Sequence, residues 1–167
     1  QHGTRYAEKY GVSQKQISAG YEELIRRGYS SNQALAAQKS LLQASIASGD
    51  SYSDVVTGAT SALESFGLRS SSTAKMTANT KMAVNQMAYA ADLTATNFKD
   101  LNYALTYTGP SAHAANQSLG ETASALGVLS NAGQDSTIAG TGLRKVLNSL
   151  VSPTKNGMTA LKSIGLS

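Results

Sequence analysis

Asp100, His113 and Ser118 are the residue types of a nucleophilic triad, in which a carboxylate orients a histidine that deprotonates a hydroxyl. Ser118 is followed three residues later by Glu121, which is the capping-box pattern of a helix start. No strained turn of the kind that presents a catalytic serine surrounds Ser118. We therefore expect Ser118 to cap a helix, and we assign no catalytic residue here.

Glu64 is the second candidate for chemistry, because Glu64-Ser65 resembles the catalytic Glu-Ser pair of helical lytic transglycosylases. That reaction needs an acid with a raised pKa inside a sugar-binding groove. The companion Gly-Leu-Met-Gln type of motif is absent downstream, and Glu64 lies just before an expected helix end at Gly67. The sequence favours a surface glutamate, and peptidoglycan cleavage with Glu64 as the acid remains an alternative function.

Metal and cofactor sites are not expected in this chain. It contains no Cys, and its ten carboxylates are scattered except for Glu22 and Glu23, which point to different faces of a helix. Of the two histidines, His2 lies in the N-terminal segment and His113 has no neighbouring ligand in the sequence. The sequence therefore predicts no catalytic, cofactor-binding or metal-ligating residue.

The charge pattern argues against an extended basic surface. The net charge is +4, yet Arg26-Arg27 and Arg144-Lys145 are the only adjacent basic pairs, and aromatic residues do not accompany them. Charged residues make up only 14% of the chain, against about 25% in a typical soluble domain. Solvated helix faces are the favoured interpretation, and a helical DNA-binding domain is a further alternative.

Apolar residues recur with helical spacing along the chain, and no segment shows the sustained alternation of a strand. We expect an all-α bundle of about eight to nine short-to-medium helices joined by tight Gly/Ser/Pro turns. Residues 1–10 are expected to be a poorly defined N-terminal segment, and residues 11–167 a single helical domain from a longer protein. The expected helices are 13–27, 31–48, 52–66, 71–93, 97–108, 110–116, 119–132, 136–150 and 154–164.

Helix ends are strongly marked. Capping boxes begin at Ser13, Ser30 and Ser118, and Ser152 is expected to cap a helix whose first residue is Pro153. Gly109-Pro110 is expected to separate two helices. Left-handed glycines are expected to end helices at Gly11, Gly28, Gly67, Gly133 and Gly165.

Two sets of residues inside the expected helices have packing interpretations. Gly127, Gly140 and Gly142 each favour close approach of another backbone, with local flexibility as the alternative. Three methionines on one long Ala-rich helix favour filling of gaps between small residues, with an adaptable binding surface as the alternative. These methionines are Met76, Met82 and Met87.

The ordered combination of these helix ends, over roughly residues 10 to 167, resembles the tail tape measure protein family of long-tailed bacteriophages and prophages. The upstream Gly-apolar-Ser joints at Gly11, Gly28 and Gly67 belong to this resemblance. The remaining matching residues are Asp100-Leu101, Ala104-Leu105, Tyr107, Gly109-Pro110, Ser118, Glu121-Thr122-Ala123, Ala125-Leu126, Leu129, Asn131-Ala132-Gly133, Gly140-Thr141, Leu143-Arg144 and Ser152-Pro153-Thr154.

This resemblance implies a non-enzymatic, largely helical domain that acts in tail length determination, tail assembly and genome delivery into the host. It implies a place in the lumen of the virion tail tube, and in the host cytoplasm during assembly. The partners implied are tail tube, tail-tip and tail-assembly chaperone proteins, self-association, and contact with the host envelope. It implies no specific nucleic acid.

Overall fold

The computed structural model describes residues 10–165, and within this range the chain is all-α, as the sequence predicts. The expected N-terminal segment 1–10 lies almost wholly outside the described residues. Eight helices follow one another, and their bounds are α2 Gln14–Arg26, α3 Ser31–Ser48, α4 Tyr52–Ser65, α5 Thr73–Leu93, α6 Phe98–Ala114, α7 Leu119–Asn131, α8 Ser136–Val151 and α9 Lys155–Ser163.

The predicted helix ends are confirmed at most joints. Ser13, Ser30 and Ser118 each cap a helix, and each forms a complete capping box with the residue three positions later. The serine oxygen accepts from an otherwise unpaired N–H, and the Gln or Glu side chain accepts from the cap residue's own N–H. The five predicted stop glycines all have positive φ, which only glycine adopts at low cost: Gly11, Gly28, Gly67, Gly133 and Gly165.

The predicted break at Gly109-Pro110 is wrong, because α6 continues through Pro110. A proline normally pushes the preceding residue away from helical geometry by a clash with its Cβ, and Gly109 has no Cβ to clash. Gly109 is also held from outside: a Cβ added there would lie 2.7 Å from Cβ of Ser65 in α4. Packing against α4 therefore keeps one continuous helix where the sequence predicts two.

Replacing Pro110 by alanine is expected to raise the free energy of unfolding. Proline leaves the carbonyl of Thr106 without its helical N–H donor, and Pro110 is exposed, so its loss leaves no internal cavity. The gain should be part of the roughly 3 kcal/mol that separates proline from alanine inside a helix. Urea unfolding followed by circular dichroism measures it, and a loss of stability in Pro110→Ala would contradict this account.

The predicted cap at Ser152 is also wrong. Ser152 ends α8, where its N–H donates to the carbonyl of Asn148 at 2.9 Å. Thr154 caps α9 instead, and its hydroxyl accepts from the N–H of Gly157 at 3.2 Å. Pro153 consequently lies between two caps and not at the first helical position.

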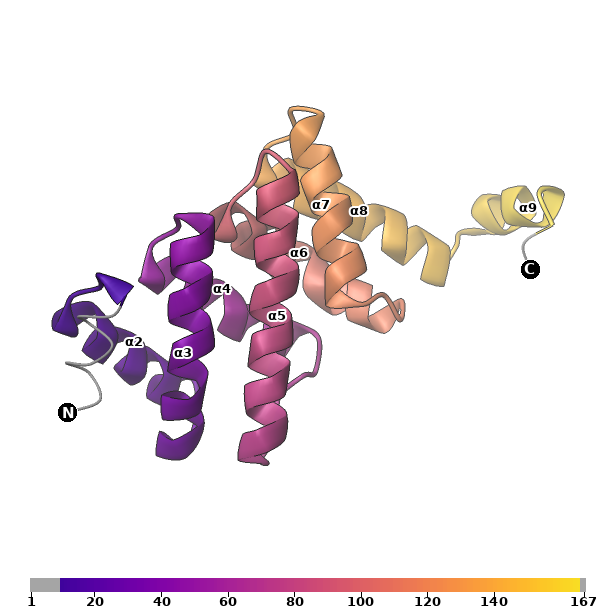
Figure 1. The fold of residues 1–167 in the computed structure, drawn as a ribbon. Coiled ribbons are helices and arrows are strands. Elements are labelled where there is room, and N and C mark those ends of the chain that lie inside the picture. The colour runs from indigo at the N-terminus through magenta and orange to yellow at the C-terminus, as the bar shows by residue number, and fades with distance from the viewer. Residues whose placement is uncertain (1–9, 166–167) are drawn as a thin grey trace.

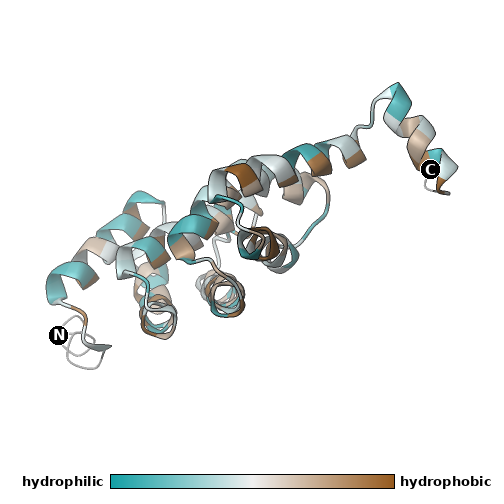
Figure 2. Cartoon of the chain, turned by 90° about the horizontal axis from the view of Figure 1, so that it is seen from above, coloured by the Kyte–Doolittle hydropathy of each residue, from teal (hydrophilic) through white to brown (hydrophobic). Residues whose placement is uncertain are grey.

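The helices alternate between two layers. Helices α3, α5 and α7 lie side by side in one layer, and α2, α4, α6 and α8 form the other, as the contacts between helices two apart in the chain show (Figure 1). The layer of α3, α5 and α7 stands upright in Figure 1 and is seen nearly end-on in Figure 2, so the two layers cross steeply. Helix α9 lies beyond the end of this array (Figure 1).

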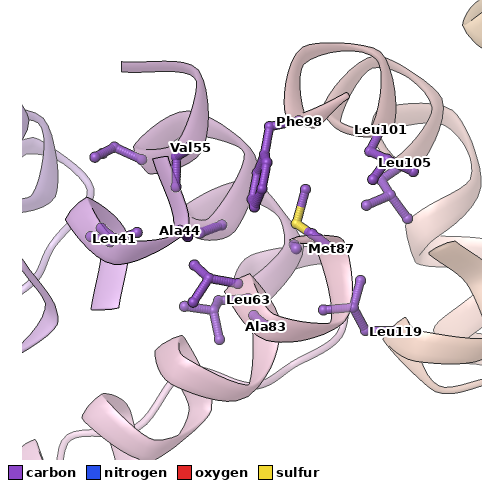
Figure 3. Packing of buried hydrophobic residues seen from close by; sticks show 14 of the residues in the cluster. Leu41, Ala44, Val55, Leu63, Ala83, Met87, Phe98, Leu101, Leu105 and Leu119 are labelled. Carbon is purple, nitrogen blue, oxygen red and sulfur yellow. The ribbon is translucent and has the colours of Figure 1, made fainter. Parts of the chain in front are cut away.

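A single core of buried apolar side chains runs between the layers from Ile17 in α2 to Leu147 in α8. Its centre brings together Leu41 of α3, Leu63 of α4, Met87 of α5 and Phe98 of α6 (Figure 3). Many members are alanines, as the composition predicts, so adjacent helices approach closely. Helix α9 contributes no buried residue to this core.

Candidate functional site

The structure does not bring Asp100, His113 and Ser118 together. Asp100 and His113 lie near opposite ends of α6, about 20 Å apart along the helix at 1.5 Å per residue. Asp100 belongs to the cap of α6, because its carboxylate accepts from the Asn97 amide at 2.9 Å. The His113 ring packs edge-on to Phe66, with ring centroids 6.5 Å apart. These contacts are those of helix ends and packing, not of a catalytic triad.

Ser118 acts in the cap of α7, and its substitution by alanine should show this. Hydrogen bonds from Ser118 Oγ and its N–H, at 2.7 and 2.8 Å, reach the Glu121 carboxylate and hold the pKa of Glu121 below its ordinary value. Ser118→Ala is expected to lower the free energy of unfolding by about 0.5–2 kcal/mol. It should also raise the pKa of Glu121 toward its ordinary value in an NMR titration.

The sign of the accompanying pH effect follows from the lowered folded-state pKa of Glu121. The stabilisation from this carboxylate is present above its unfolded-state pKa and is lost as the pH falls through the folded-state pKa. The stability difference between wild type and Ser118→Ala should therefore shrink in acid. An unchanged difference across that range would contradict the proposed hydrogen bonds.

Glu64 lies near the C-terminal end of α4, where its carboxylate accepts from Arg69 Nη1 at 3.1 Å. Both side chains are substantially exposed, at 45% for Glu64 and 37% for Arg69. A general acid of the glycosidase type lies in an apolar pocket, whereas the Glu64 carboxylate lies at the surface beside a guanidinium group. The surroundings of Glu64 thus favour the surface interpretation over the acid.

The adjacent carboxylates Glu22 and Glu23 also take no common role. Glu23 accepts from Arg27 at 2.7 Å and from Arg26 at 2.6 Å, and the hydrogen bond from Arg27 is the main reason that the pKa of Glu23 is lowered.

A hollow of about 250 Å³ between α2 and α4 is lined in part by Glu23, Arg26 and Ser51. Among residues 10–165, no group of three or more His, Asp or Glu side chains could hold a metal ion.

The two basic pairs lie in different surroundings. Arg26 and Arg27 share one carboxylate, that of Glu23, which offsets one of their two positive charges. Arg144 and Lys145 are exposed on α8 and form no ion pair with any described residue. Neither pair belongs to a longer basic run in the sequence.

Glycines inside the helices mark where helices meet. A Cβ added to Gly140 would lie 2.6 Å from the carbonyl oxygen of Ala104 in α6, so the predicted close backbone approach is confirmed there. At Gly127 the near neighbour is the side chain of Thr94, with its Oγ1 at 2.6 Å, and not a backbone. At Gly142 the prediction is wrong, because no described atom lies within 4 Å of the added Cβ.

The methionines divide between core and surface. Met76 and Met87 are buried among small residues, as the packing interpretation predicts. Met82 is 36% exposed and does not belong to the core.

An uncovered apolar surface at the end of the array was not anticipated from the sequence. Ile138, Val146 and Leu150 of α8 are each more than half exposed, although they carry apolar side chains at helical spacing. The sequence signal is an apolar pattern on α8 wider than one neighbouring helix can cover. Helix α6 covers one side of α8, whereas α9 lies beyond the end of the array (Figure 1).

No helix among the described residues has the length and apolar character needed to cross a membrane. The described part of the chain is a two-layer helical array in which many polar side chains cap helices. The chain belongs to the phage-related minor tail protein family, whose match covers residues 1–167.

Two relatives make this family assignment more specific. The chain is 29% identical over 159 residues to the tape measure protein of Pneumococcus phage Dp-1, covering 95% of this chain and 13% of the relative. It is 42% identical over 73 residues to the probable tape measure protein of Escherichia phage P2, covering 44% of this chain and 9% of the relative. The predicted resemblance to tape measure proteins is confirmed, and the chain spans only a small part of these relatives. No solved structure matches it.

Proposed function

We propose that this chain is a structural domain of a phage tail tape measure protein, acting in tail length determination, tail assembly and genome delivery. The observation that carries the proposal is the family match over residues 1–167, together with relatives that are themselves named tape measure proteins. The domain has no catalytic role in this proposal. The contacts of three candidate residues support the absence of a catalytic role. Glu64 forms an ion pair with Arg69, His113 packs against Phe66, and Ser118 caps α7.

The proposed location is the tail tube lumen of the virion, with the host cytoplasm as the place of assembly. The proposed partners are the tail tube, tail-tip and assembly chaperone proteins, further copies of the chain, and the host envelope during infection. The low content of charged residues, 14%, supports association, because such a surface repels neighbouring proteins only weakly.

Purified tails of the encoding phage test this location. Mass spectrometry should find peptides of this chain in intact tails, and protease should cleave them only after the tails are opened or have ejected DNA. A tail-tube protein serves as the control for tube integrity. Cleavage of this chain in intact tails, or its absence from tails, would contradict the proposed location.

A further inference from the structure

Asn156 is the only asparagine in the sequence that is followed by a glycine. The peptide nitrogen of a residue that follows an asparagine can attack Cγ of the asparagine side chain and close a cyclic imide, a succinimide. A side chain on the following residue hinders this attack, and glycine has none. Asn156 is also exposed, so water reaches the pair. The residue types and their surface position together favour loss of the side-chain amide at Asn156.

The reaction needs only water and a solvent base. A bond forms between the nitrogen of Gly157 and Cγ of Asn156, and the bond between Cγ and the side-chain nitrogen breaks. The N–H proton of Gly157 passes through solvent to the leaving nitrogen, which departs as ammonia. Water then opens the imide: attack at Cγ leaves an aspartate at position 156, and attack at the backbone carbonyl carbon leaves an isoaspartate. Overall, a water molecule is consumed and an ammonia molecule is released.

The helical form of α9 opposes this attack. Thr154 caps α9, and its Oγ1 accepts from the N–H of Gly157 at 3.2 Å, so this nitrogen is held in the cap. Helical backbone angles at Asn156 also keep its Cγ away from the nitrogen of Gly157, and the ring closes only when Asn156 rotates toward an extended conformation. The first turn of α9 must therefore open before the imide forms.

Opening of this turn is expected to be frequent. Helix α9 has nine residues, and isolated helices shorter than about 12–15 residues are marginal in water. None of its residues is buried, it lies beyond the end of the array (Figure 1), and Gly157 lowers its helix propensity. A segment with few buried contacts opens locally at low free-energy cost.

Asn148 in α8 provides an internal comparison. It is exposed like Asn156, and it is followed by a small residue, Ser149. Its helix, however, packs on α6, and the adjacent Leu147 is buried in the core. The side chain of Ser149 and the anchored helix should both protect Asn148.

We propose that Asn156 is a site of spontaneous deamidation and that opening of the first turn of α9 sets its rate in the folded chain. The modification adds a negative charge to a basic segment, because from Ser136 onward the sequence has four basic residues and no Asp or Glu. An aspartate at position 156 lies in the first turn of α9, where a negative charge stabilises a helix. An isoaspartate lengthens the backbone by a carbon atom and interrupts the hydrogen bonds of that turn. The inference does not depend on the proposed function.

Incubation of the purified chain in mildly alkaline buffer tests the site, with a parallel sample unfolded in guanidinium chloride. Peptide mapping by mass spectrometry follows Asn156 and Asn148, and an isoaspartyl methyltransferase labels the isoaspartate. In the folded chain, Asn156 should convert more slowly than in guanidinium chloride, but by no more than about tenfold. It should convert at least about tenfold faster than Asn148 in the same sample.

Two variants separate the chemistry of the pair from the opening of α9. Gly157→Ala should slow conversion in both the folded and the unfolded sample, since the new side chain hinders the attack. Its Cβ would lie 3.4 Å from Pro153 Cβ and Thr154 Oγ1, so the fold accommodates it. Thr154→Ala removes the cap and should speed conversion about twofold or more in the folded chain only. Ser118→Ala is the matched control, because it removes a cap from α7 and should leave the rate at Asn156 unchanged.

Several results would overturn the proposal. An intact Asn156 in the folded chain, when the unfolded chain converts, would show that α9 protects the pair. Conversion of Asn148 as fast as Asn156, or an unchanged rate in Gly157→Ala, would remove the special role of the Asn-Gly pair. Equal rates in the folded and unfolded chain, or an unchanged rate in Thr154→Ala, would show that opening of α9 does not set the rate.

Discussion

Replacement of Phe98 by alanine is expected to lower the free energy of unfolding by about 3–5 kcal/mol. Phe98 is fully buried at the start of α6, and its ring lies at the centre of the core beside Met87 and Val55 (Figure 3). It also packs on Gly58, where a Cβ would come within 3.4 Å of the ring. Removing the ring therefore opens a cavity where α4, α5 and α6 meet, and urea unfolding measures the loss.

Tyr103 provides a matched control for Phe98. It is an aromatic residue on the same helix, but it is 51% exposed and outside the core. Tyr103→Ala is expected to change the free energy of unfolding by no more than about 0.5 kcal/mol. Equal losses in Phe98→Ala and Tyr103→Ala would show that the core is not centred where the structure has it.

Two glycines in α8, two positions apart, are expected to respond to alanine with opposite sign. Gly140→Ala places a Cβ 2.6 Å from the carbonyl oxygen and 2.8 Å from Cα of Ala104, so α6 and α8 must move apart. The buried hydrogen bond from Thr108 Oγ1 to the Gly140 carbonyl, at 2.6 Å, is disturbed by the same movement. We expect the free energy of unfolding to fall by about 1–3 kcal/mol in thermal and urea unfolding.

Gly142→Ala should instead raise the free energy of unfolding by up to about 1 kcal/mol. No described atom lies within 4 Å of the added Cβ, so only the higher helix propensity of alanine remains. Because that propensity gain applies to both glycines, the difference between the two variants isolates the contact of α8 with α6. A destabilised Gly142→Ala, or a stabilised Gly140→Ala, would contradict the packing described here.

Local chemistry made the helix ends predictable. A Ser followed three residues later by Gln or Glu specifies its own cap, and a left-handed glycine specifies its own stop, without reference to the rest of the chain. This is why the starts at Ser30 and Ser118 and the stops at Gly28 and Gly67 were predicted correctly.

Features that depend on contacts between distant segments could not be predicted in this way. Pro110 reads as a helix break until Gly109 is seen packed on Ser65 of α4. Gly140 and Gly142 read alike, since both are glycines within one helical pattern, and only the position of α6 separates them. The exposure of Ile138 and Val146 on α8 is likewise a property of the array, because it depends on where the other described helices lie.

The tail length of the encoding phage tests the central claim most directly, which is that this chain acts as a structural segment of a tape measure protein. A phage carrying a tandem duplication of residues 13–165 should have uniformly longer tails in electron micrographs. The increment should reach about 230 Å if the helices extend end to end at 1.5 Å per residue, and a few tens of Å if the two layers stay packed.

A phage with Glu64→Gln and His113→Gln should have tails of unchanged length and normal infectivity. Unchanged tail length after the duplication, or loss of infection in the Glu64→Gln, His113→Gln phage with normal tails, would contradict the account.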